Sequence, residues 1–455
     1  MIVGRLDSRR CRRMCRSRSP RAEAASVGMW QHERMELRSH KIDQNMTTHV
    51  SGGPLAGIQV LDLTSIISGP FAGQLLAELG ADVVKIESPE GDTQRRIGPV
   101  LHDGMGPVYM NSNRGKRSIA IDLKKRQGCQ VLYKLVRGAD VLLYNMRYRA
   151  MHRLGLSYEI LSDLNPRLIY AGIFGFGQDG PYADRPAYDD LIQAAAGLAD
   201  FMRQKSSGEP QYVPLAIADR IAGFHAALAI AAALTERARS GCGQRLDIPM
   251  FENVVSLVLA DHLGGRSFEP ALDRGGYARL LIASRKPFTT KDGHVSVMPF
   301  TDEQWRRLYV ITDRSEQFEC DQRLRSMEMR SRHIDALYAE LADILRSRTT
   351  DEWLQRFEEA DIPAMPVHNL QSLFDDPHLK AIGFFQAEAH PSEGPLNRMR
   401  YANHWSRTPP APSRPAPRLG EHGFEVLREA GFGANEIADL IEQGALFGID
   451  RSAAE

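Results

Sequence analysis

Hydrophobic residues recur in two alternating patterns from about residue 54 onward. Short runs that are apolar throughout indicate strands buried on both faces, whereas apolar residues spaced three and four apart indicate helices. The runs that predict strands are 57–64, 81–87, 117–123, 140–145 and 167–175. The runs that predict helices are 69–80, 124–139 and 159–165. Buried strands separated by helices predict a parallel sheet covered on both faces, so we expect an α/β, Rossmann-like unit over roughly 54–250.

The pattern changes in the second half of the chain. Two long helical patterns at 188–202 and 218–241 come first. Residues 285–300 then alternate around a Lys-Asp-Gly turn, which is typical of short antiparallel strands, and 330–348 predicts an amphipathic helix. Five prolines between 409 and 417 predict a stiff linker. We therefore predict a large domain over 51–260, a smaller α+β domain over 270–385, and a linker with a C-terminal segment over 386–455.

The formal net charge of zero hides an uneven distribution. Residues 1–50 carry eleven basic and five acidic residues and no apolar run of the kind found in secretory signals. We interpret this segment as a disordered tail or as a start assigned too early. The rest of the chain holds 46 basic and 52 acidic residues. This mildly acidic body predicts no overall attraction to nucleic acid or to an anionic membrane.

Cysteine usage and hydropathy bear on the compartment. The five cysteines are scattered, with no C-x-x-C pair and no spacing typical of zinc ligands, so we expect reduced thiols and no metal site. The longest apolar stretch, 222–234, is too short to span a bilayer. We therefore expect a cytoplasmic protein.

A glycine-rich loop follows the last predicted strand. Gly175, Gly177 and Gly180 form G-x-G-x-x-G, the pattern of dinucleotide-binding loops. Such a loop must open a helix, but Pro181 and Pro186 prevent a continuous helix directly after it. The pattern therefore does not predict a dinucleotide site, and the loop must serve another purpose.

Carboxylates after this loop are the strongest candidates for chemistry. Asp189 and Asp190 begin a predicted helix, where acidic residues stabilise the helix dipole; capping and function both fit them. Asp219 stands among apolar neighbours at the start of the 218–241 pattern. Its position fits a helix N-cap, a reactive carboxylate in a dry environment, or both.

Five segments in the same order resemble the family III CoA-transferases of the CaiB/BaiF type. Formyl-CoA transferase, carnitine CoA-transferase and α-methylacyl-CoA racemase are members of this family. The segments are 53–92, 111–124, 164–182, 187–197 and 217–234. The resemblance covers about 54–440 and implies a Rossmann-like large domain built from both ends of the chain, a small domain and an interlocked homodimer.

The resemblance also implies an activity. CoA would move from an acyl-CoA to a carboxylic acid, with Asp219 as the nucleophile that forms a mixed anhydride and then an aspartyl-CoA thioester. CoA is then a substrate, and no permanently bound cofactor is expected. The glycine loop would bring backbone N–H groups close to the reacting acyl group.

One position separates two activities within the family. Racemases carry a histidine immediately before the residue that matches Asp189, and this chain has Tyr188 there. A tyrosine with an ordinary pKa is a poor base at neutral pH, which favours transfer over racemisation. An acyl-CoA racemase or epimerase, and a catalytically silent CoA-binding subunit, remain the alternatives.

The resemblance assigns residues to CoA binding, where cations and polar groups would meet its phosphates. These residues are Ile67, Lys85, Ser88, Lys124, Asn145, Met146 and Arg153.

Two departures bear on the substrate. Formyl-CoA transferase has a run of glycines to which Gly275 and Gly276 are the nearest counterpart, and a glutamine where this chain has Ile67. Both departures argue against formyl or oxalyl substrates. Three arginines in twelve residues suggest recognition of the distal carboxylate of a dicarboxylic acid, although a basic surface loop fits them equally. These are Arg274, Arg279 and Arg285.

Overall fold

The computed structural model describes residues 52–206, 208–410 and 414–448. The interpretation of residues 1–50 as a tail or a misassigned start lies outside the described residues. The domain limits predicted at 51–260, 270–385 and 386–455 stay predictions, and the elements are described below by the sheets and cores that they form.

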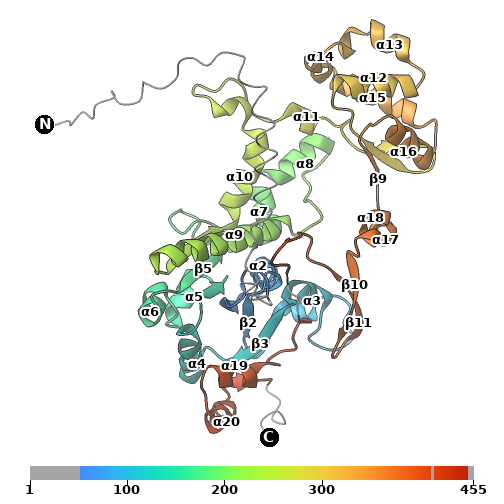
Figure 1. The fold of residues 1–455 in the computed structure, drawn as a ribbon. Coiled ribbons are helices and arrows are strands. Elements are labelled where there is room, and N and C mark those ends of the chain that lie inside the picture. The colour runs from blue at the N-terminus through green and yellow to red at the C-terminus, as the bar shows by residue number, and fades with distance from the viewer. Residues whose placement is uncertain (1–51, 207, 411–413, 449–455) are drawn as a thin grey trace, which may run out of the picture. The chain divides into compact units, whose positions relative to one another are not determined.

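A seven-stranded sheet forms the centre of the first set of elements (Figure 1). Its strand order is β12-β3-β2-β1-β4-β5-β6, and all neighbours are parallel except the short β12, which runs antiparallel to β3. The strands are β1 (Gln59–Leu63), β2 (Asp82–Glu87), β3 (Lys116–Ile121), β4 (Val141–Tyr144), β5 (Ile169–Phe174), β6 (Gln244–Pro249) and β12 (Leu446–Phe447). The predicted Rossmann-like α/β fold is confirmed. The strand order reverses between β1 and β4, and ligands of such folds bind at that point, outside the carboxyl ends of the strands.

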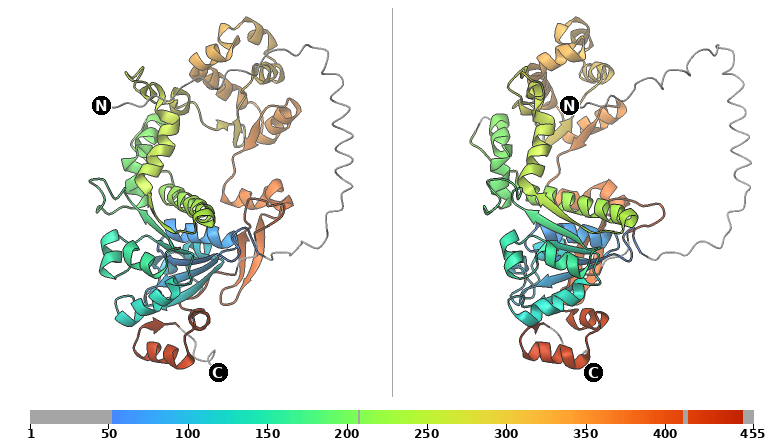
Figure 2. Two further views of the ribbon diagram at one scale, coloured as in Figure 1. Left: turned by 60° about the vertical axis from the view of Figure 1, so that its left-hand side comes forward. Right: turned by 90° about the vertical axis from the view of Figure 1, so that its left-hand side faces the viewer.

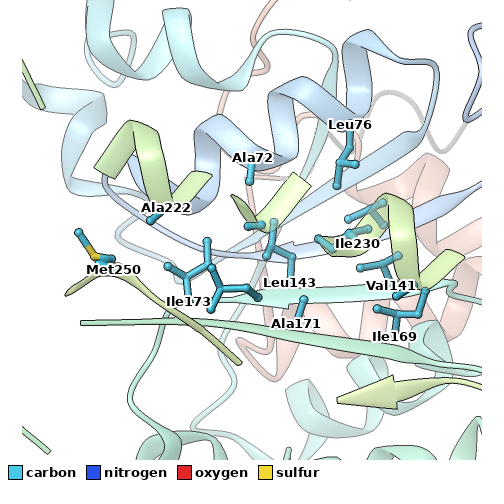
Figure 3. Packing of buried hydrophobic residues seen from close by; sticks show 14 of the residues in the cluster. Ala72, Leu76, Val141, Leu143, Ile169, Ala171, Ile173, Ala222, Ile230 and Met250 are labelled. Carbon is cyan, nitrogen blue, oxygen red and sulfur yellow. The ribbon is translucent and has the colours of Figure 1, made fainter. Parts of the chain in front are cut away.

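Helices cover both faces of this sheet because its strands present apolar side chains on both sides. Val141 and Leu143 of β4 face one core, whereas Leu142 and Tyr144 face the other, as the two-residue period of a strand requires. The first core lies under α2 (Ser68–Glu78) and α9 (Ile217–Ser240). Figure 3 shows α2 and α9 directing side chains at the strands in this core; the labelled ones are Ala72, Leu76, Ala222 and Ile230.

The second core is covered by helices from both ends of the described chain. These helices are α4 (Arg126–Val136), α6 (Tyr158–Leu164), α19 (Gly423–Glu429) and α20 (Ala434–Glu442). Figure 2 shows α9 in green on one side of the strands and the two C-terminal helices in red on the other. The C-terminal helices therefore pack on the large sheet, to which β12 also belongs.

The first set also contains further helices and two 3₁₀ turns. They are the helices α3 (Pro107–Asn113), α5 (Tyr148–Arg153), α7 (Asp189–Ala195), α8 (Leu198–Ser206), α10 (Met250–His262) and α11 (Ala278–Leu281), and the 3₁₀ turns Thr93–Arg96 and Gly264–Ser267. The prediction of one helix over 188–202 is wrong. The chain breaks between α7 and α8 at Gly197, whose φ of +83° lies in the left-handed region and ends a helix.

A second set of elements has its own sheet and core. The antiparallel sheet β7-β8-β9 contains the predicted hairpin, with strands Phe288–Thr289, His294–Val297 and Ala364–Pro366. Its helices are α12 (Asp302–Ile311), α13 (Ser315–Cys320), α14 (Met327–Arg332), α15 (Ile334–Leu345) and α16 (Thr350–Glu359), with a 3₁₀ turn at Gln322–Leu324. Trp305, Trp353 and Phe357 are fully or almost fully buried in this core. The predicted helix over 330–348 is divided between α14 and α15.

The chain that follows the second set of elements forms two short helices, α17 (Leu370–Asp375) and α18 (Pro377–Ala381). It then forms an antiparallel hairpin of β10 (Phe385–His390) and β11 (Gly394–Met399), which the sequence pattern did not predict. Residues 414–417 of the proline-rich segment that follows are hydrogen-bonded to residues that precede β3. Gly115 N–H donates to the Arg414 carbonyl at 2.7 Å, and the Tyr109 hydroxyl donates to the Pro417 carbonyl at 2.9 Å.

Candidate active site

Two adjoining cavities open where the strand order reverses. The Lys124 cavity, of about 570 Å³, is bounded by the residues that follow β1, β2 and β3 and by α5. The Asp219 cavity, of about 340 Å³, is bounded by the residues after β1, β4 and β5, the segment before α7, and the first turn of α9. Ser65 and Met146 line both cavities. A long ligand that follows these two residues would therefore occupy both cavities.

Most of the residues assigned to CoA binding line these cavities. Ser88, Lys124, Met146 and Arg153 line the Lys124 cavity. The Lys124 side chain is exposed, so its ammonium group is accessible to an anion. Asn145 lines the Asp219 cavity.

Two of the assigned residues line neither cavity. Lys85 is fully buried, and its Nζ donates to the Thr64 carbonyl at 2.9 Å and to Asp92 Oδ2 at 3.1 Å. Its charge is therefore engaged inside the protein. Ile67 is half-buried at the N-cap position of α2.

The loop between β1 and α2 adopts a strained conformation beside the Asp219 cavity. Ile66 has a φ of +75°, which is rare for a β-branched residue because its branched side chain meets the backbone. Its N–H group lies 3.2 Å from each carboxylate oxygen of Asp92. The Asn145 side chain binds both backbone polar groups of Ser65, the residue before Ile66. It accepts from Ser65 N–H at 3.1 Å and donates to the Ser65 carbonyl at 2.8 Å. Asn145 therefore positions this loop.

Sequence reasoning missed the contributions of Ile66 and Asp92. No residue pattern marks a left-handed isoleucine, since the strain exists only because surrounding hydrogen bonds impose it. Lys85 could have pointed to Asp92, because Lys85 stands in an apolar run that predicts a buried strand, and a buried ammonium group needs a carboxylate partner.

Asp219 occupies the third position of α9, and its side chain is half-buried. The N-cap residue of α9 is Ala216, so the interpretation of Asp219 as an N-cap is wrong. The capping group comes instead from α7: Asp189 Oδ1 accepts the N–H of Asp219 at 2.9 Å. The other carboxylate oxygen of Asp189 accepts from Gln193 Nε2 at 2.6 Å.

The surroundings of Asp219 raise its pKa to about 6. Burial makes the largest contribution because it disfavours the charged form, and the neighbouring carboxylate of Asp189 acts in the same direction. Hydrogen bonding by Ser68 opposes both effects. At neutral pH Asp219 is therefore mostly ionised, yet it is poorly solvated, and this combination suits a carboxylate nucleophile.

The glycine loop packs closely beside the same cavity. Gly175 lines the Asp219 cavity, and a Cβ there would lie 2.2 Å from that of Ala187. Gly177 N–H donates to Glu252 Oε1 at 2.8 Å, so this group is occupied and does not supply the free donor that the resemblance implied. No helix opens at Gly180, and turns follow it up to α7, which agrees with the exclusion of a dinucleotide loop.

The residues before α7 also face the Asp219 cavity. Tyr188 lines this cavity with 63% of its surface exposed and occupies the N-cap position of α7, without a capping hydrogen bond from its side chain. Asp190, the next acidic residue along the helix, is exposed and does not line the cavity.

The glycine pair matched to the glycine run of formyl-CoA transferase lies in a turn after α10. Gly275 and Gly276 have φ values of +75° and +90°, a conformation that favours glycine, and Gly276 N–H donates to the His262 carbonyl at 2.7 Å. Neither glycine lines the two cavities of this chain. The same holds for the three arginines suggested for a distal carboxylate, which are Arg274, Arg279 and Arg285.

Two further observations concern metals and membranes. Across 52–206, 208–410 and 414–448, no group of three His, Cys, Asp or Glu side chains is arranged to hold a metal ion. In the same residues, α9 has the length and composition of a membrane-spanning helix, a test that core helices also pass. The apolar run at 222–234 was judged too short to span a bilayer, but the whole helix is long enough. This helix packs on α2 in the first core.

Comparisons with known proteins agree with the resemblance. Residues 55–423 match the model of CoA-transferase family III. The chain is 36% identical to a succinate–glutarate CoA-transferase of Agrobacterium fabrum, over 83% of this chain and 95% of that protein. It is 30% identical to the human succinyl-CoA:glutarate CoA-transferase, over 86% of this chain and 90% of that protein. The crystal structure of a CaiB/BaiF family protein from Brucella suis superposes with a TM-score of 0.72 at 32% identity, covering 83% of this chain and all of that one.

Proposed function

This chain belongs to CoA-transferase family III, and from that premise we propose that it moves CoA from an acyl-CoA thioester to a carboxylic acid through Asp219. The observation that carries the proposal is the position of Asp219. It is a half-buried carboxylate with a raised pKa, in a cavity that adjoins a second, larger cavity lined by cations.

The first half of the reaction transfers CoA to the enzyme. An Asp219 oxygen attacks the thioester carbonyl, the C–S bond breaks, and CoA leaves as a thiolate. The thiolate then attacks the Asp219 carbonyl of the resulting mixed anhydride and releases the donor acid as a carboxylate. The product is an aspartyl-CoA thioester. Covalent catalysis of this kind divides a difficult exchange into easier steps.

The second half repeats these steps in reverse order with the acceptor. The acceptor carboxylate attacks the aspartyl thioester and expels CoA thiolate, which then attacks the acceptor carbonyl of the new anhydride. The new acyl-CoA leaves, and the Asp219 carboxylate is restored. The reaction consumes no water, and water would hydrolyse the mixed anhydride and the aspartyl-CoA thioester. Exclusion of water therefore protects both intermediates.

The two cavities divide CoA between them in this proposal. Lys124 and Arg153 face the phosphates in the Lys124 cavity, where cations give charge-assisted hydrogen bonds. Ser88 lines the same cavity and adds a hydroxyl group. The pantetheine chain passes Ser65 and Met146, which line both cavities, and places the thioester beside Asp219.

We propose dicarboxylic acids as the substrates. The relatives named for succinate and glutarate support this class, as does a succinyl-CoA:mesaconate CoA-transferase of Haloarcula hispanica that is 32% identical over 84% of this chain. Ile67 in place of glutamine argued against formyl and oxalyl groups at the sequence level.

We also propose that the protein acts in the cytoplasm as an interlocked homodimer. Large apolar side chains on α9 and α10 are exposed, including Phe224 (57%), Leu228 (67%) and Leu257 (53%), and a second copy of the chain would cover them. Light scattering should give twice the mass of one chain, and a monomer would contradict this part of the proposal.

A transfer assay tests the activity. With succinyl-CoA as donor and glutarate as acceptor, glutaryl-CoA should form, and Asp219→Ala should reduce turnover by at least about 10³-fold because it removes the nucleophile. Asp190→Asn is the matched control, since Asp190 is exposed and lies outside the cavity. A silent CoA-binding subunit would show no turnover, and a racemase would exchange the α-proton of an acyl-CoA with solvent without moving CoA.

A further inference from the structure

Two arginines line the Asp219 cavity together with the nucleophile. They are Arg147, before α5, and Arg185, before α7. Among the described residues, neither guanidinium group forms an ion pair with a carboxylate. The acidic residue next to Arg185 is Asp184, and its carboxylate is already paired with Arg149 at 2.7 Å. The cavity thus holds two positive charges that remain available to a ligand.

The two arginines differ in their position relative to CoA. Arg147 follows Met146, which lines both cavities, so it lies near their junction. Arg185 belongs to the run 183–188, which lines only the Asp219 cavity. A group bound at Arg185 therefore lies on the acyl side of the thioester, apart from the cavity that Lys124 and Arg153 share.

Stacking orients the Arg185 side chain. Its guanidinium carbon lies 3.9 Å from the centre of the Tyr182 ring, as in a cation–π pair. A guanidinium group stacked by its face keeps the N–H donors along its edge free. These donors match the two oxygens of a carboxylate.

We propose that Arg185 binds the distal carboxylate of a dicarboxylic acid while the proximal carboxylate reacts at Asp219. This inference rests on the proposed function and adds the residue that selects the substrate class. A distal carboxylate in this cavity requires a cation, because an unpaired charge loses its hydration there. In the donor half of the reaction the distal carboxylate of the acyl-CoA also shares the cavity with ionised Asp219. Arg185 supplies that cation, and the arginines at 274, 279 and 285 do not line the cavity.

The test compares two acceptors of equal chain length with one donor. Glutarate carries a distal carboxylate, and valerate carries a methyl group in its place. Because transfer through an enzyme-bound CoA follows ping-pong kinetics, kcat/KM for the acceptor reports only the second half of the reaction. Effects of a variant on the donor therefore do not enter the comparison.

We expect the wild type to prefer glutarate, and Arg185→Gln to lower kcat/KM for glutarate by roughly 10- to 100-fold, the loss typical of a missing charged hydrogen bond. Transfer to valerate should change less than about threefold, which also shows that the variant folds. For Arg185→Lys, kcat/KM for glutarate should fall between the values of the wild type and Arg185→Gln, because lysine keeps the charge but not the paired donors. Arg203→Gln, on α8 outside the cavity, is the control.

Three results would overturn the inference: equal losses for both acceptors in Arg185→Gln, no loss for either, or a wild type that uses valerate as well as glutarate. All three leave the CoA-transferase activity intact. Failure of the proposed function is a different result, namely a wild type that transfers CoA to neither acid and takes no CoA onto Asp219.

Discussion

The N–H group of Asp219 donates a hydrogen bond of 2.9 Å to the side chain of Asp189, thirty residues earlier in the chain. This single contact joins the start of α7 to the first turn of α9. It satisfies one of the N–H groups that a helix leaves unpaired at its start. It also places a second carboxylate beside that of Asp219, which contributes to the raised pKa of Asp219. Asp189 therefore holds the first turn of α9 in place and helps to set the basicity of Asp219.

The first prediction concerns the pH dependence of this pair. The proposed attack requires Asp219 to be ionised, and the pKa of Asp219 is raised to about 6. We expect kcat/KM for the acyl-CoA to be constant at high pH and to fall tenfold per unit below about pH 6, as the carboxylate becomes protonated.

Asp189→Asn isolates the contribution of the second carboxylate. The amide oxygen of asparagine can still accept the Asp219 N–H, but the negative charge is gone and the amide NH2 group takes the place of the oxygen that accepts from Gln193 Nε2. The pKa of Asp219 should therefore fall, and the acidic limb of the pH profile should move to lower pH. A limb that stays in place or moves to higher pH would contradict this role for Asp189.

The second prediction separates the buried Lys116 from the exposed Lys124, for which we propose contact with CoA. Lys116 is fully buried, and its Nζ donates to Asp62 Oδ2 at 2.7 Å and to Asn113 Oδ1 at 2.8 Å. Lys116→Ala leaves the buried Asp62 carboxylate unpaired and should lower the free energy of unfolding by about 3–5 kcal/mol. Lys124→Ala, at an exposed position, should leave it within about 0.5 kcal/mol of wild type but weaken CoA binding.

Urea unfolding and a CoA titration measure these two effects. The double variant Asp62→Leu with Lys116→Met provides a further check, because removing both charges restores much of the lost stability. Equal unfolding free energies for Lys116→Ala and Lys124→Ala would show that the buried pair does not matter for stability.

The third prediction concerns the contact between the two helices that carry Asp219 and Ser68. A Cβ at Gly223 of α9 would lie 2.7 Å from the Ser68 carbonyl oxygen and 2.8 Å from the Phe71 ring. Gly223→Ala should move α9 away from α2. Overpacking costs about 1–3 kcal/mol, which exceeds the roughly 0.5–1 kcal/mol that alanine contributes through helix propensity.

We expect Gly223→Ala to lose both stability and kcat, measured by thermal unfolding and by the transfer assay. Gly138→Ala is the control, because its nearest neighbouring atom would lie 3.8 Å from the new Cβ. If Gly223→Ala retains the wild-type kcat, the spacing of these helices is not critical for the reaction.

Much of the fold could be predicted because the large sheet is buried on both faces. Strands such as Val141–Tyr144 then appear as uninterrupted apolar runs, and the helices between them indicate that the strands are parallel. The hairpin of β10 and β11 was missed because many of its side chains are only half-buried, so its residues carry little hydrophobic pattern. The division of 188–202 depended on the backbone conformation at Gly197, which alternating polarity does not reveal.

The site was predictable only in part for a related reason. The family resemblance identified Asp219 and the residues around the Lys124 cavity through matching segments. It did not separate the exposed Lys124 from the buried Lys85, because burial depends on contacts such as that with Asp92. Arg185 was overlooked because an arginine in a loop looks like any solvated charge until the cavity it lines is known.

The most direct measurement of the central claim is mass spectrometry of the protein after mixing with succinyl-CoA and rapid acid quenching. We expect an adduct of the size of CoA on the peptide that contains Asp219, and no such adduct in Asp219→Ala. Treatment with hydroxylamine should remove the adduct and leave a hydroxamate on the same side chain. An active protein whose Asp219 peptide never carries CoA, or an adduct on a different residue, would contradict the account.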